Sequence, residues 1–182
     1  MSVQTLPTFD KPMTTQEAYD LFDSLDVASI DFMRGRWRGG ECKTGHSMDG
    51  LLEATGWYGK HFVSEEIVHP LLFSRGKTLY AVNPALAPLS GLIPKWGILK
   101  YVMYIFGLIV QTKQPKARLR MMEFRGKMSA AMVYDARPII DCFRKLDDST
   151  LLGLMDMRNM EPPCFFLLHK DESEKKQRYK TS

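Results

Sequence analysis

The chain has 182 residues, of which 45% are hydrophobic and 25% are charged, so it is long enough for one globular domain with a substantial core. Its 25 basic and 21 acidic side chains give a net charge of only +4, which is too small to indicate a dedicated nucleic-acid-binding protein. The three cysteines, Cys42, Cys142 and Cys164, are widely spaced and form no CxxC pair. We therefore expect free buried thiols in a reducing compartment rather than disulfides.

The amino-terminal residues 1–11 contain no basic stretch followed by an apolar run, so no secretory signal is predicted. The longest apolar stretch, Ile98 to Val110, is shorter than the roughly 20 residues that a membrane-spanning helix needs. It is apolar nearly all round, so it is either buried or acts as a lid, a dimer contact or a membrane-touching portal flanked by lysines. We expect a cytoplasmic protein in which this segment, if it is not core, makes a peripheral membrane contact or a homodimer contact.

The first predicted element is a helix that begins after Thr14, because Thr14 and Glu17 have the spacing of a capping box and apolar residues follow at helical intervals. Residues 31–42 then alternate with period two, which predicts a strand. A second short helix is predicted at 47–55, where Gly56 provides a C-cap.

Short runs rich in β-branched and aromatic residues follow. They predict strands at 62–69 and 78–83, at 117–125 and 127–135, and at 150–158 and 164–169. Residues 83–94 contain three prolines and a glycine and are interpreted as a loop or crossover. Pro138 is expected to open a short helix, with Asp135 as its cap rather than as a catalytic base.

About seven or eight strands without a repeated βαβ rhythm favour a mainly β fold with a few short helices, a β-barrel or a strongly curved sheet rather than a doubly wound fold. The whole chain, residues 1–182, is interpreted as one barrel-like domain. Its segments are 14–83, a loop and apolar segment at 84–116, a second strand-rich segment at 117–169, and a charged, flexible tail at 170–182.

The stretch RGRWRGG, residues 34–40, places a tryptophan between two glycines and arginines at alternate positions. In a barrel strand an inward-facing Trp37 supplies a large apolar plug, and the nearby glycines relieve crowding and allow the strand to bend. Trp37 either closes the barrel floor against the first helix or lines a ligand site. Arg34, Arg36 and Arg38 face the other way, either as a solvated or ion-paired stripe or as a site for an anion or phospholipid headgroup.

The segment FMRGRWRGGECKTGHSMDGLLEATGWYGKHF resembles the GXWXG family. The later segment ARLRMMEFRGKMSAAMVYDARPIIDCFRKLDDSTLLGLMDMR resembles the companion carboxy-terminal domain of unknown function, and ARLR, EFRG, MVYD, RPI and LGLMD match it in order. The resemblance extends over residues 18–168. By analogy with other barrels that have a Gly-Trp strand, it implies a calycin- or lipocalin-like β-barrel that binds a lipid, and it implies no particular activity or cofactor.

No catalytic motif accompanies this pattern. The sequence lacks G-x-S-x-G, a phosphate-cradling loop, H-E-x-x-H and paired CxxC motifs, so no nucleophile, metal or cofactor is predicted. His46, His61 and His69 are expected to be ordinary surface or core histidines, with a metal or haem site as the alternative. Asp141 and Asp156 are further carboxylates within the later segment.

The predicted strand at 117–125 carries Arg118 and Arg120 at alternate positions. If this strand lies near the barrel mouth, the arginines can hold an anionic group while flexible methionines line an apolar interior; core packing is the alternative for the methionines. The predicted ligand-binding residues are Arg36, Trp37, Arg118, Arg120, Met121, Met132 and Met155.

These features favour a binding protein for a hydrophobic anionic ligand, a fatty acid or a phospholipid, in an interior reached near residues 98–110. One alternative is an enzyme that acts on a small apolar substrate with an aspartate or histidine as acid or base. Another is a structural protein that associates with itself through the apolar segment. No nucleic-acid partner is expected.

Overall fold

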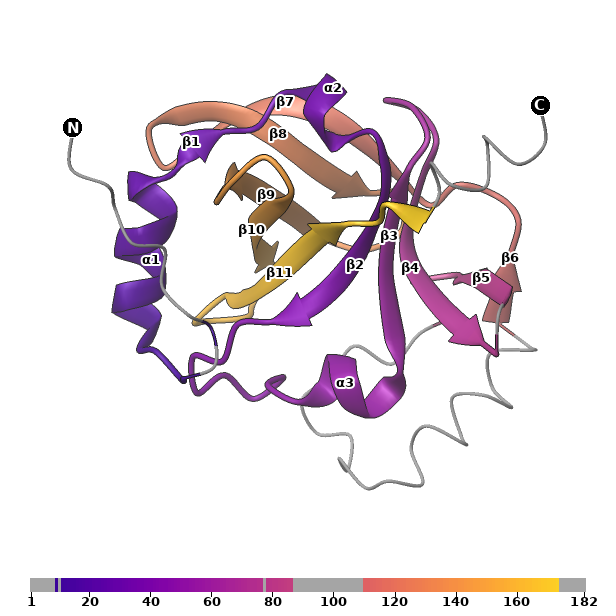
Figure 1. The fold of residues 1–182 in the computed structure, drawn as a ribbon, viewed down its shortest axis with the longest axis horizontal. Coiled ribbons are helices and arrows are strands. Elements are labelled where there is room, and N and C mark those ends of the chain that lie inside the picture. The colour runs from indigo at the N-terminus through magenta and orange to yellow at the C-terminus, as the bar shows by residue number, and fades with distance from the viewer. Residues whose placement is uncertain (1–8, 10, 77, 87–109, 174–182) are drawn as a thin grey trace.

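The structure, a computed structural model, describes residues 9, 11–76, 78–86 and 110–173 (Figure 1). These residues form three short helices around an antiparallel barrel. The helices are α1 (Thr15–Ser24), α2 (Ile30–Met33) and α3 (Leu51–Thr55). The strands are β1 (Asp26–Val27), β2 (Gly35–Glu41), β3 (Trp57–Phe62), β4 (Val68–Arg75), β5 (Thr78–Val82), β6 (Gln111–Thr112), β7 (Ala117–Phe124), β8 (Lys127–Tyr134), β9 (Ile139–Lys145), β10 (Thr150–Met157) and β11 (Cys164–Lys170).

Eight strands close the barrel, in the order β3-β2-β11-β10-β9-β8-β7-β4, because β4 also pairs with β3. Strands β7 and β4 meet through one paired position, Val68 opposite Ala117. Strands β5 and β6 continue the sheet beyond the ring, and β1 pairs with β9. The predicted class, a mainly β barrel with a few short helices, is confirmed, and both of its strand-rich segments contribute to the ring.

Apolar side chains from every strand of the ring fill the barrel interior. They include Trp37, Phe62, Val68, Leu119, Met132, Phe143, Leu151 and Phe166. A second apolar layer lies outside the barrel, where α1 covers the sheet (Figure 1). Phe22 of α1 packs edge-on against Phe165 of β11, with ring centroids 6.3 Å apart. Strands β8 to β11 are therefore buried on both faces, which explains their nearly continuous apolar sequences.

The predicted start of α1 is confirmed. The Thr14 backbone N–H donates to the Glu17 carboxylate at 2.6 Å, and the Glu17 N–H donates to the Thr14 hydroxyl at 3.2 Å. The hairpin of β7 and β8, which turns at Gly126, and the pairing of β10 with β11 also agree with the sequence prediction. All three cysteines are free and buried.

The helix predicted after Pro138 is wrong, because residues 139–145 form strand β9. Asp141 and Phe143 face the interior, whereas Cys142 packs in the outer layer, so the segment follows period two. Asp135 therefore caps no helix and instead pairs with Arg118. The strand predicted at 62–69 is also wrong: it contains the connection between β3 and β4.

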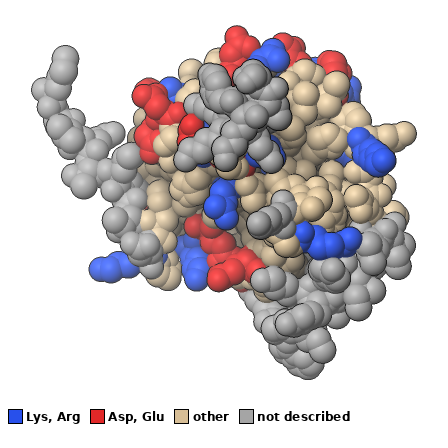
Figure 2. Space-filling view, turned by 45° about the vertical axis from the view of Figure 1, so that its right-hand side comes forward, with Lys and Arg blue, Asp and Glu red and all other residues tan. Residues whose placement is uncertain are grey.

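Charged side chains do not form one large patch on the described part of the face in Figure 2, where acidic and basic groups are interspersed among other residues. This distribution agrees with the small net charge of +4. Among the described helices, none is long and apolar enough to cross a membrane.

An irregularity in β3 determines which side chains enter the barrel. The pairing of β3 with β4 shifts register on both sides of Gly59, whose φ is +147°. A Cβ at Gly59 would lie 1.9 Å from the backbone oxygen of Trp37. Trp57 and Lys60 are three residues apart and would face opposite sides of a regular strand, yet Lys60 lies over the Trp57 ring. Gly59 therefore makes it possible for both side chains to point inward.

We expect Gly59→Ala to lower the free energy of unfolding by about 3–5 kcal/mol, because it combines a disallowed φ with a backbone clash. Urea denaturation measures this loss. Gly76→Ala is the matched control, since its φ is +59° and nothing lies within 4 Å of the added Cβ; it should cost about 1–2 kcal/mol. Equal losses in the two variants would show that the close approach of β2 and β3 at Gly59 is not a constraint.

Candidate functional site

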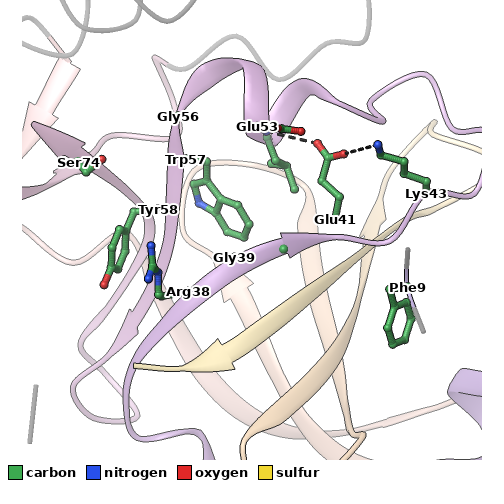
Figure 3. A pocket seen from close by; sticks show the side chains of 12 residues that line it. Phe9, Arg38, Gly39, Glu41, Lys43, Glu53, Gly56, Trp57, Tyr58 and Ser74 are labelled. Atoms are coloured by element: carbon green, nitrogen blue, oxygen red, sulfur yellow. Dashed lines mark hydrogen bonds and ion pairs between the residues drawn. The ribbon is translucent and has the colours of Figure 1, made fainter. Parts of the chain in front are cut away.

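A hollow of about 570 Å³ lies at one end of the barrel, between β2, β3 and α3. The partly buried indole of Trp57 lines it together with Leu52 of α3. Trp57 can occupy this position because Gly39 of β2 has no side chain: a Cβ there would lie 1.9 Å from the indole. Figure 3 shows Trp57 above Gly39, beside α3. A cavity of this volume is in the range of small-molecule sites.

Charged and polar groups surround the hollow. The Arg38 guanidinium lies over the Tyr58 ring, 5.4 Å from its centroid, on the other side of β3 from Trp57 (Figure 3). Lys43 Nζ is 3.9 Å from the Glu41 carboxylate, a long ion pair, and Glu41 also accepts a hydrogen bond from the Glu53 N–H. The hollow thus combines an apolar floor with two cations on its rim.

A polar centre lies inside the barrel, on the inner side of Trp57. Lys60 Nζ is 2.8 Å from Asp141 Oδ2, and the two side chains are only 4% and 1% exposed. Lys60 lies on β3 and Asp141 on β9, so the ion pair joins strands from the two halves of the sequence. Burial raises the pKa of the Asp141 carboxyl, and the Lys60 ammonium partly opposes that rise.

Tyr134 of β8 completes this centre. Its hydroxyl accepts a hydrogen bond from Lys60 at 3.3 Å and donates to Asp141 Oδ2 at 3.5 Å. Burial and the adjacent Asp141 carboxylate raise the pKa of Tyr134 well above its usual value. Lys60 Nζ also lies 5.0 Å from the Phe166 ring centroid and 5.4 Å from that of Trp57. Aromatic faces therefore stabilise the ammonium in a region that excludes water.

The predicted residues of β2 lie on opposite faces of the strand. Trp37 is fully buried in the barrel, and its indole N–H donates to the Met33 carbonyl at 2.7 Å. It therefore packs against α2, as a plug, and not against the first helix. Arg36 lies outside, where its Nε is 3.2 Å from the Asp171 carboxylate.

The structure does not bring the other predicted residues together. Arg118 and Arg120 lie on the outer face of β7 and pair with Asp135 and Glu66, at 3.0 and 2.7 Å. Met121 is 41% exposed. By contrast, Met132 and Met155 are buried in the barrel interior. The apolar segment at 98–110 lies outside the described residues apart from its last residue, so the membrane and homodimer contacts stay predictions.

The histidines lie away from the polar centre. His46 is buried and accepts the Met48 N–H through Nδ1. His61 and His69 are paired across β3 and β4 and line a second hollow of about 340 Å³. Burial lowers the pKa of His69. The described residues contain no group of three or more His, Cys, Asp or Glu side chains that could hold a metal ion.

Sequence reasoning did not identify Trp57, Lys60 or Tyr134 as site residues, and it noted Asp141 without a role. A weak signal existed for Asp141, because a carboxylate within the apolar run Ile139 to Phe143 must be either paired or functional. No comparable signal marked Lys60, whose inward orientation depends on the irregularity at Gly59.

Fold and site together define a closed antiparallel barrel with a ligand-sized hollow at one end and an ion pair in its interior. Residues 20–77 match the GXWXG protein family, and residues 115–170 match a domain of unknown function, DUF4334. A solved structure described as a protein from Thermomonospora curvata is 30% identical, with a TM-score of 0.67; the match covers 88% of this chain and 90% of that chain. No curated protein sequence matches the chain. The chain belongs to the GXWXG family, as its sequence indicated.

We expect Asp141→Ala to lower the free energy of unfolding by about 3–5 kcal/mol, because it leaves the Lys60 ammonium buried without its counter-charge. The double variant Lys60→Met, Asp141→Leu should lose much less, since it removes both charges. Urea denaturation of the wild type, the single variants Lys60→Met and Asp141→Leu, and their double variant gives the coupling energy.

Asp135→Ala is the matched control for this comparison. It breaks an ion pair whose side chains are 46% and 38% exposed, so it should cost no more than about 1 kcal/mol. A double variant as unstable as Asp141→Ala would contradict the assignment of the loss to an unpaired buried charge.

Proposed function

We propose that this protein binds a hydrophobic anionic ligand, of the fatty-acid or phospholipid kind, in the hollow floored by Trp57. The proposal rests on the lining of the cavity of about 570 Å³. The Trp57 indole and the aliphatic Leu52 side chain supply its apolar part, and Arg38 and Lys43 supply two cations. An amphiphile has the same two parts, an apolar chain and a charged end.

The charges of the rim favour an anion in spite of the two carboxylates beside them. Within the described residues Arg38 has no carboxylate within 4.0 Å, and its contact is the Tyr58 ring. The Lys43 ammonium is 3.9 Å from Glu41, a long contact, and its side chain is 52% exposed, so it can also reach an anion in the hollow. Glu41 and Glu53 lie on the α3 side, where the backbone N–H of Glu53 already occupies one Glu41 oxygen.

The same geometry makes Arg38 and Lys43 better candidates for the anionic end than Arg118 and Arg120. The latter pair lies on the outer face of β7 and is engaged by Asp135 and Glu66. Neither of them lines the hollow. A ligand that occupied the hollow would therefore meet the cations of β2 and its following loop first.

Isothermal titration calorimetry with dodecanoate tests the proposal. We expect the double variant Arg38→Gln, Lys43→Gln to bind about tenfold or more weakly, because two charge-assisted contacts to the carboxylate are lost. The wild-type affinity should fall as salt is added, since the rim is exposed to solvent. Methyl dodecanoate, which lacks the charge, should bind the wild type and the double variant equally.

The matched control is Arg118→Gln, Arg120→Gln, which removes two cations from the barrel surface and should leave the affinity unchanged. Loss of binding in this control, with full binding by the Arg38 and Lys43 variant, would move the anion site to β7. Failure of the wild type to bind any acyl chain would exclude the proposed function.

A further inference from the structure

In the ion pair inside the barrel, the Lys60 ammonium uses all its hydrogen-bond donors, whereas one oxygen of Asp141 has no partner. An ammonium has three N–H donors, and three acceptors lie within reach of Lys60 Nζ: Asp141 Oδ2, the Tyr134 hydroxyl at 3.3 Å and the Pro70 carbonyl at 3.4 Å. Asp141 Oδ2 accepts from both Lys60 and Tyr134. Lys60 is therefore fully engaged as a cation and has no free donor to offer.

Asp141 Oδ1 is the exception. It is buried and has no hydrogen-bond partner. An unsatisfied acceptor on a buried carboxylate is costly, so it calls for a donor that the surrounding side chains do not supply. The Trp57 indole N–H is likewise buried and without a partner. Two complementary polar atoms, one acceptor and one donor, thus remain unsatisfied on side chains that both contact the Lys60 ammonium.

Trp57 connects this centre with the hollow. The indole lines the hollow and also lies over Lys60, 5.4 Å from Nζ, which is itself 2.8 Å from Asp141. A ligand bound against Trp57 is therefore separated from Asp141 by two side chains, those of Trp57 and Lys60.

The charge of the centre restricts what a ligand can place there. Lys60 and Asp141 neutralise each other, so a further buried charge would have no counter-ion. A ligand carboxylate would be repelled by Asp141, and an ammonium by Lys60. A neutral hydroxyl matches these two atoms chemically, because a hydroxyl can donate to a carboxylate oxygen and accept from an N–H.

We infer that Asp141 recognises a hydroxyl group on the apolar chain of the ligand, so that the preferred ligand is a hydroxylated fatty-acyl anion. This inference rests on the proposed function, which places the anionic end at Arg38 and Lys43. The hydroxyl then lies deeper, past Trp57, and provides a second point of recognition inside the barrel.

Calorimetric titration of the wild type with hexadecanoate, its mid-chain hydroxy and ω-hydroxy derivatives, and their methyl ethers tests this inference. At least one hydroxy acid should bind about tenfold or more tightly than hexadecanoate, the scale of one hydrogen bond to a charged group. Its methyl ether, which cannot donate, should lose that advantage. A hydroxyl makes the chain more soluble in water, so hydrophobic burial alone predicts the opposite order.

The variants Asp141→Asn and Tyr134→Phe locate the effect. Asp141→Asn should abolish the preference for the hydroxy acid over hexadecanoate, whereas Tyr134→Phe should retain the preference because Oδ1 is untouched. If Asp141→Asn does not fold, the double variant Lys60→Met, Asp141→Leu takes its place, because it removes Asp141 without leaving a buried charge unpaired, and it should lose the preference for the hydroxy acid.

The possible failures are distinct. Equal wild-type affinities for every acid and ether of the series would overturn the inference and leave the proposed function intact. A hydroxyl preference that persists in folded Asp141→Asn would also overturn it, because the hydroxyl would then be recognised elsewhere. Absence of binding by all the acids would overturn the proposed function, and this inference with it.

Discussion

The ion pair of Lys60 and Asp141 lies in a barrel interior that excludes water from both groups. Removing two charges from water is costly, and the cost is offset only if each charge finds its partner and the remaining donors are satisfied. Tyr134 and the Pro70 carbonyl supply those contacts, and aromatic rings surround the ammonium. Because the two charges come from β3 and β9, they can meet only when the ring of strands is closed. The pair therefore couples the two family-like segments of the sequence into one unit.

Two tryptophans differ in how they are packed: Trp37 lies in the core and Trp57 lines the hollow. Trp37 donates its N–H to Met33 and is completely buried, so it acts as a fixed plug. Trp57 is only partly buried, and its N–H has no partner. Glycines permit both arrangements: Gly59 approaches the backbone of Trp37, and Gly39 leaves room for the Trp57 ring. Within the GXWXG motif, Trp37 therefore lies in the core, and Gly39 leaves space for the Trp57 ring beside the hollow.

The outer layer explains why the barrel can tolerate an interior that is not purely apolar. Helix α1 buries Phe22 against Phe165, and the outward faces of β8 to β11 form a second core there. Stability from this layer does not depend on how the interior is filled. The fold can then accommodate a polar centre and a neighbouring hollow, because the hydrophobic driving force is distributed over two layers. Arginines that are prominent in the sequence, such as Arg118 and Arg120, belong to the exposed surface and its ion pairs instead.

The sequence by itself determined the class of fold, the capping box at Thr14, the long hairpins and the family, because these depend on local periodicity, turn residues and short motifs. It also determined that Trp37 faces inward. It placed a helix after Pro138 because a proline suits a first helical turn, whereas tertiary pairing with β8 and β10 made this segment a strand. Only the tertiary structure decided the site. Trp57, Lys60, Tyr134 and Asp141 are separated by up to 84 residues in the chain, and what joins them is the strand register, the irregularity at Gly59 and the closure of the ring. No local pattern encodes such contacts, because they arise from the order in which strands pair and from the requirement that a buried charge be neutralised.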